Sequence, residues 1–218
     1  MLPRVSGLLS NGDHKAVNKM HELSFLIYNL VIFPIIAGLL IVNKDFVSFF
    51  LGKDFQEAYL AIAIMVFRMF FIGWTNIMGI QILIPHNKHR EFMLSTTIPA
   101  VVSVGLNLLL IPPFGFVGAS IVSVLTEALV WFIQLYFCLP YLKEVPILES
   151  LAKIVCASTM MYGLLLSAKP FLHFPPTLSV LVFAVLGGLI YLLAILVLKV
   201  VDVKELKQII GKKLEMRK

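Results

Sequence analysis

The chain has 218 residues, of which 60% are hydrophobic and 14% are charged, with a mean hydropathy of +0.96. Soluble proteins carry about 25% charged residues, so a soluble domain of this composition could not cover its surface, and the class indicated is an integral membrane protein. The net charge of +6 is weak evidence for nucleic-acid binding, because the basic residues cluster in the connectors and the tail. Cys138 and Cys156 match no metal or redox spacing.

Six stretches are long and apolar enough to cross a bilayer, since about 20 helical residues span its hydrocarbon core. They cover about residues 23–42, 57–84, 91–111, 115–137, 150–167 and 177–198. We therefore expect an all-α, polytopic transmembrane bundle over residues 22–201. A polar segment at 1–21 precedes it, and a basic amphipathic helix at 202–218 follows it.

Local signals refine this order. Pro34 predicts a kink within the first span. Residues 46–51 are rich in phenylalanine and could form a short interfacial helix ended by Gly52. The second span is long, which predicts a tilt or an extension beyond the bilayer. The third and fourth spans meet at a tight turn over residues 111–115, IPPFG.

The Lys and Arg residues are distributed unevenly between the two ends of these spans. With six spans both termini lie on one side, and the segments on that side hold 14 Lys and Arg residues against 3 on the other. Cytoplasmic loops carry the excess of basic residues. We therefore expect both termini, and the connectors around Lys88 and Lys143, to lie in the cytoplasm.

Two charged residues lie alone inside apolar spans, Arg68 in the second and Glu127 in the fourth. Both lie about 17 Å from the outer face, counted at about 1.5 Å per residue. A charge in this position needs a partner or water. The alternatives that stay open are a structural ion pair, a cavity site for an anionic substrate or coupling ion, and independent roles or snorkelling of Arg68. Arg68 also shares a predicted helix face with Thr75 and Gly79, which suggests a polar cavity.

Further polar residues occur in the same three spans, at helical spacing. The candidate cavity residues beside Arg68 and Glu127 are Asn76, Asn107 and Gln134. His86 and His89 have a spacing that permits a metal site, but no carboxylate or cysteine pattern supports one. We find no nucleophile, phosphate-loop, dinucleotide or metal-hydrolase motif. The prediction is a transporter that uses no cofactor and no metal and is not an enzyme.

Three segments resemble a known family: MLPRVSGLLSNGD at 1–13, FVSFFLGKDFQEA at 46–58 and LNLLLIPPFGFVGASIVSVLTE at 106–127. They are similar to the polysaccharide repeat-unit flippases, which export O-antigen and capsule precursors and belong to the multidrug/oligosaccharidyl-lipid/polysaccharide exporter superfamily. The resemblance implies two six-helix lobes around a cationic cavity, as in multidrug-and-toxin-extrusion (MATE) exporters, and alternating access. It also implies that this chain is the C-terminal lobe plus a terminal helix pair.

The function implied by the resemblance is translocation of undecaprenyl-pyrophosphate-linked oligosaccharide across the inner, cytoplasmic membrane. Arg68 would attract the pyrophosphate, and Asn76, Asn107 and Gln134 would bind sugars. The implied partner is an N-terminal lobe or a second copy of the chain. The alternatives are a related multidrug or lipid exporter, a non-transporting structural fragment, and a subunit of a membrane glycosyltransferase or acyltransferase, for which clustered acidic or histidine residues are missing.

Overall fold

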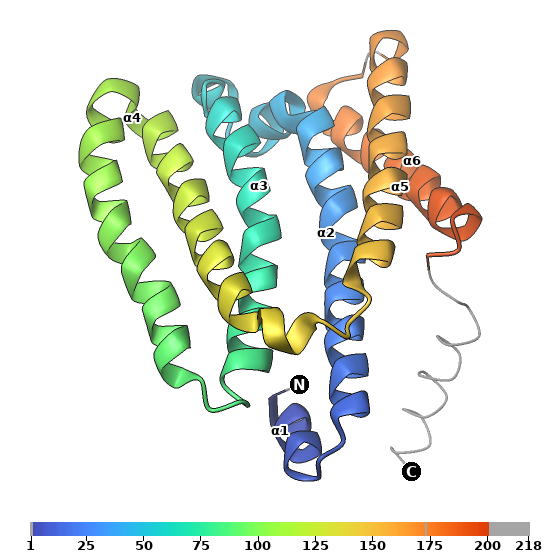
Figure 1. Cartoon of the computed structure of the whole chain (residues 1–218). Helices are drawn as coiled ribbons and strands as arrows, with labels where there is room; N and C mark the ends of the chain where they lie inside the picture. Colours follow the sequence, from blue (N-terminus) through green and yellow to red (C-terminus); the bar gives the residue numbers. More distant parts are fainter. Residues whose placement is uncertain (1, 173, 201–218) are drawn as a thin grey trace.

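The computed structural model describes residues 2–172 and 174–200, and this part of the chain is an all-α bundle without strands (Figure 1). The main helices are α1 (Leu2–Ser10), α2 (His14–Phe50), α3 (Ala58–Asn76), α4 (His89–Leu142), α5 (Ile147–Ala168) and α6 (Pro176–Val197). Short helical turns lie between them at η1 (Lys53–Phe55), η2 (Ile77–Leu83) and η3 (Lys169–Phe171). The predicted basic helix at 202–218 lies outside the described residues.

Among the described residues, five helical stretches are long and apolar enough to span a membrane, and one of them, α4, consists of two long arms. Its 54 residues fold back on themselves at Gly115, where φ is 55° and ψ is −132° (Figure 1). Side chains other than glycine avoid this backbone region. Gly118 lets the two arms start close together, because a Cβ atom there would overlap the backbone oxygen of Leu110. The predicted all-α bundle and the turn at 111–115 are therefore confirmed, and the bounds of the six predicted spans stay a prediction.

Helix α2 is longer than the first predicted span. It starts after Asp13, whose side chain accepts a hydrogen bond from the backbone nitrogen of Ala16 at 3.0 Å, and it continues through Pro34 to Phe50. At about 1.5 Å per residue, its 37 residues extend about 55 Å. The prediction of a separate interfacial helix at 46–51 is wrong, because these residues continue α2. Gly52, with φ of 90°, marks the turn that follows.

The second predicted span consists of α3 and the wider π-helical turn η2. Together they run for 26 residues, in agreement with the long apolar stretch predicted there. The turn packs tightly. A Cβ atom on Gly79 would lie 2.5 Å from the Phe92 ring of α4, so η2 and α4 touch at this level. Met78, Ile82 and Leu83 are fully buried against the same neighbour. The π-helical turn therefore belongs to the packed core.

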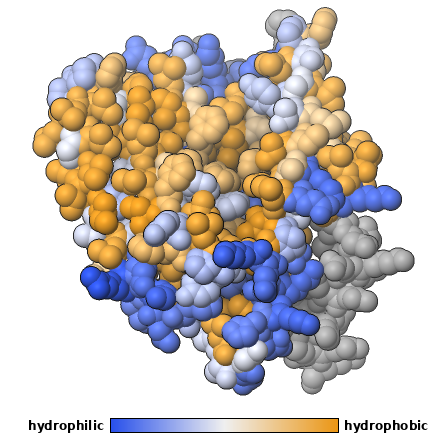
Figure 2. Space-filling model, in the orientation of Figure 1, coloured by the Kyte–Doolittle hydropathy of each residue, from blue (hydrophilic) through white to orange (hydrophobic). Residues whose placement is uncertain are grey.

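Helix α2 lies at the centre of the bundle, between two groups of helices (Figure 1). On one side it packs against α3, with Phe25 on Trp74 at a ring distance of 4.7 Å. On the other side it packs against α5 and α6, where the Tyr191 hydroxyl donates a hydrogen bond to the Leu30 carbonyl at 2.8 Å. A broad apolar surface covers the spans, and hydrophilic residues gather at the end where α2 begins (Figure 2).

Asp45 ties the last two helices to α2. Its carboxylate accepts a hydrogen bond from the Ser179 hydroxyl of α6 at 2.8 Å and lies 3.7 Å from the ammonium of Lys169 in η3. Lys169 also donates a hydrogen bond to the Ile41 carbonyl of α2. These bonds fix the end of the bundle opposite the N-terminal segment.

Candidate functional site: an ion pair within the spans

Arg68 and Glu127 form an ion pair between α3 and the second arm of α4. An Nη2 atom of Arg68, on α3, lies 3.0 Å from an Oε1 atom of Glu127, on the second arm of α4. The side chains keep 36% and 20% of their surface exposed. The equal depth estimated from the sequence is consistent with this contact, and the question of whether the two residues pair is answered. The remaining exposure allows a third, anionic group to approach.

The guanidinium of Arg68 is only partly satisfied by this contact. Its Nε atom is buried and has no hydrogen-bond partner among the described residues. An arginine carries five N–H donors in a planar fork that matches carboxylate and phosphate oxygens. Arg68 can therefore hold Glu127 and still donate to another oxyanion.

An aromatic wall lies one helical turn from the ion pair. Phe71 follows Arg68 by three residues and Trp131 follows Glu127 by four, so each ring shares a helix face with a charge. The two rings lie edge to face with centroids 5.9 Å apart, and Trp74 lies 6.0 Å from Trp131. Sequence reasoning missed this wall, although the i+3 and i+4 spacings were a usable signal. A wall of low polarity strengthens the attraction between the two charges.

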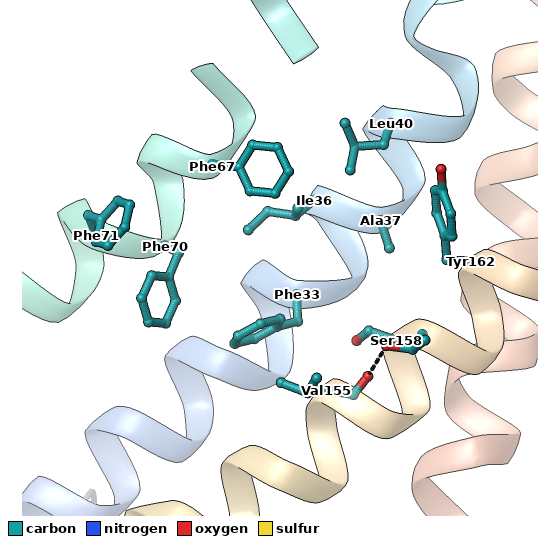
Figure 3. A pocket seen from close by; sticks show the side chains of 11 residues that line it. Phe33, Ile36, Ala37, Leu40, Phe67, Phe70, Phe71, Val155, Ser158 and Tyr162 are labelled. Carbon is teal, nitrogen blue, oxygen red and sulfur yellow. Dashed lines mark hydrogen bonds between the residues drawn. The ribbon is translucent and has the colours of Figure 1, made fainter. Parts of the chain in front are cut away.

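An apolar pocket of about 440 Å³ opens beside the same segment of α3 (Figure 3). Phe67, Phe70 and Phe71 of α3 form one side, next to Arg68 in sequence. Figure 3 shows side chains of α2 between these rings and Ser158 and Tyr162 of α5. The lining is almost entirely apolar, so the pocket suits a hydrocarbon chain rather than a sugar.

The other predicted site residues lie elsewhere. Asn76 is exposed at the end of α3, and its amide donates to the carbonyl of Ile72 at 2.8 Å. Asn107 donates to the carbonyl of Ser103, also at 2.8 Å. Both bonds lie within the residue's own helix, which leaves the amide oxygens available to a ligand.

Gln134 is in the packed interior, with 1% of its surface exposed. Its amide nitrogen lies 3.2 Å from the Ser95 hydroxyl, so it joins the two arms of α4. The predicted face of Thr75 and Gly79 is also closed: Thr75 is buried, and the Phe92 ring covers Gly79. The sequence argument that this face is a polar cavity is therefore wrong. The first arm of α4, which carries Phe92, occupies the space beside this face, and the periodicity of a single helix cannot predict such a neighbour.

The fold defines a polytopic helical membrane protein with an ion pair between its apolar helices. The family described as lipid II flippase MurJ matches residues 1–201, so this chain belongs to the MurJ family of lipid-linked precursor flippases. Flippases of this family are transporters and not catalysts. The predicted lipid-linked flippase family is confirmed at this general level, and the match favours lipid II flippases over the narrower O-antigen group.

One relative is the uncharacterized membrane protein MJ1068 of Methanocaldococcus jannaschii, 24% identical over 212 residues. The match covers 97% of this chain and 41% of that protein, so the chain spans about two fifths of the relative's length. No solved structure matches the chain.

Proposed function

We propose that this chain forms part of a flippase that moves a pyrophosphate-linked glycan lipid across the cytoplasmic membrane by alternating access. The observation that carries the proposal is the partly exposed pair of Arg68 and Glu127 between two spans of a MurJ-family chain. A charge within the spans of a membrane protein marks a substrate or ion pathway by default. The guanidinium suits the pyrophosphate because it can donate to two of its oxygens at once.

In this proposal the pyrophosphate binds Arg68 beside Glu127. When the substrate is absent, the carboxylate balances the guanidinium, which would otherwise be costly to leave unpaired. When the substrate binds, its phosphate oxygens take the Nη donors that Glu127 leaves free, because the Arg68 side chain keeps 36% of its surface exposed. Asn76 and Asn107 would offer hydrogen bonds to the glycan, and Gln134 would hold the α4 arms in place. The apolar pocket beside Phe67 would contact the lipid chain.

The glycan itself has two candidates. The family favours the lipid II precursor. The segments at 1–13, 46–58 and 106–127 favour an undecaprenyl-pyrophosphate-linked repeat unit of O-antigen or capsule. Depletion of the protein distinguishes the two candidates. The substrate of a depleted flippase accumulates on the inner leaflet, so the identity of the accumulated lipid-linked glycan is the measurement.

Transport requires a second lobe facing the ion pair, from a longer polypeptide, a separate chain or a second copy. We expect residues 1–218 alone not to restore export in a flippase-null strain, and co-expression with a matching N-terminal lobe to restore it. The measurement is the fraction of lipid-linked glycan that is accessible from outside the cell. Restoration by residues 1–218 alone would favour a homodimer, and failure of every combination would contradict the flippase proposal.

The membrane orientation is a separate prediction. The segments predicted as cytoplasmic do meet at one end of the bundle, where His14, His86 and Lys143 line a common pocket. We expect this end to face the cytoplasm because of its excess of basic residues. The test places a single cysteine at position 88 or 169, in a background lacking Cys138 and Cys156, and treats intact cells with a membrane-impermeant thiol reagent. Position 169 should react and position 88 should not, and the opposite pattern would reverse the orientation.

A further inference from the structure

A second pocket, polar and remote from the ion pair, lies at the end of the bundle where α2 begins. It measures about 390 Å³, within the size range of small-molecule sites. Three distant segments line it: the first turns of α2, the connector before α4, and the end of α4 with the residues that follow. We call it the end pocket. Apart from Val17 and Pro140, every side chain that lines it is polar.

The polar groups of the end pocket are mostly potential cations and hydrogen-bond donors. Lys143 is exposed at its rim, and His14, His21 and His86 line it from two segments. Nδ1 of His86 lies 2.7 Å from the Ile82 carbonyl and therefore donates to it, and the imidazole ring lies 4.0 Å from the Tyr141 ring. His86 is thus held in place with its Nε2 atom away from that bond.

His21 is held in the same way but deeper, with 1% of its surface exposed. Its Nε2 atom lies 3.2 Å from the Gln81 carbonyl and therefore donates to it, so in the neutral ring the Nδ1 atom, which has no partner among the described residues, is an acceptor. The lining includes a single carboxylate, that of Glu144, which accepts a hydrogen bond from the Asn18 amide at 3.0 Å. Against this one carboxylate stand the Lys143 ammonium and the imidazoles of His14 and His86, so the end pocket has more potential cations than anions, which is the composition expected of an oxyanion site.

We propose that the end pocket binds a phosphate ester, in which Lys143 and His86 contact the phosphate and the remaining volume holds the group attached to it. Phosphate alone would leave most of the 390 Å³ empty, so an ester fits better. The ester can come from an anionic lipid headgroup, because the pocket lies at the hydrophilic end of the bundle, or from a soluble phosphorylated molecule (Figure 2). This site is separate from the ion pair, so it does not depend on the proposed transport function.

The test measures thermal unfolding of the purified full chain in detergent with three probes: phosphatidylglycerol, diacylglycerol with the same acyl chains, and glycerol 3-phosphate. Stabilisation by phosphatidylglycerol alone identifies a lipid headgroup, and stabilisation by glycerol 3-phosphate as well identifies a site open to soluble esters. Equal stabilisation by diacylglycerol, or none by either phosphate probe, would overturn the proposal.

Three variants assign the effect to the end pocket. Lys143→Gln should raise the dissociation constant for the phosphate probe about fivefold, which is the upper range for the loss of an exposed ionic contact. Glu144→Gln should lower the dissociation constant, because the substitution removes the carboxylate while keeping an acceptor for Asn18. Lys15→Gln, which removes an exposed lysine of α2 outside the pocket, should leave it unchanged. Equal weakening in Lys15→Gln, or weakening in Glu144→Gln, would contradict the site.

Discussion

Replacing Arg68 with alanine is expected to abolish export while leaving the amount of folded protein in the membrane near the wild-type level. The pair that it breaks is partly exposed, so Glu127 is not left as a fully buried, unpaired charge and other groups can approach it. The substrate has no such alternative, because its pyrophosphate would lose the fork of donors that holds it within the spans. The measurement combines an export assay with quantification of the protein in the membrane.

The purely structural alternative predicts a different pattern. If Arg68 serves only to pair with Glu127, then Arg68→Ala should lower the protein level, and the double variant with Glu127→Ala should restore both level and export. If Arg68 holds substrate, the double variant should remain inactive. Arg68→Lys keeps the charge but loses the planar fork, so we expect partial activity. Arg90→Ala, at an exposed position outside the pair, is the matched control, and normal export by Arg68→Ala would end the proposal.

Alanine at position 115 is expected to destabilise the α4 hairpin by about 1 to 3 kcal/mol, the range for a residue forced into a sparsely populated backbone region. The reason is the φ of 55° combined with the ψ of −132° at Gly115. Asparagine tolerates the left-handed helical region near ψ of about +47°, which is far from this ψ, so Gly115→Asn should not rescue stability. Thermal or denaturant unfolding in detergent measures the change.

Gly105 provides the control for this experiment, since it lies in the same helix with open space around its Cβ position and no positive φ. Alanine favours a helix over glycine by about 1 kcal/mol, so Gly105→Ala should be neutral or stabilising. Equal destabilisation by Gly105→Ala would mean that the turn geometry is not the cause. A neutral Gly115→Ala would contradict the strain argument directly.

The features predicted from the sequence are those that depend on one segment at a time. The length of each apolar run determines that it can cross the bilayer, and the IPPFG motif marks where α4 reverses. The depth of Arg68 and of Glu127 follows from counting residues, so their possible contact could be stated, although not decided. Each of these properties depends on one segment alone and does not change with the helices that pack against it.

The features that were not predicted depend on which helix faces which. Gln134 has the polarity of a cavity residue, but the first arm of α4 covers it and gives it Ser95 as a partner. The π-helical turn η2 changes the rotation per residue, so α-helical spacing beyond Asn76 no longer predicts the face of Gly79. The end pocket joins segments more than 50 residues apart, and no spacing rule connects His14 with His86 or Lys143.

The central position of α2 has a mechanical consequence. The pair of α5 and α6 packs chiefly on α2 and on itself, and α3 with α4 packs on the opposite flank. If the two groups of helices move relative to each other, we expect the movement to be a rotation of the pair of α5 and α6 about α2, because that helix provides most of the contacts between them. The apolar pocket of Figure 3 spans this axis, with walls from α3 and α5. A small rotation of the pair would change the width of that pocket while the distance between Arg68 and Glu127, both on the other flank, stays constant.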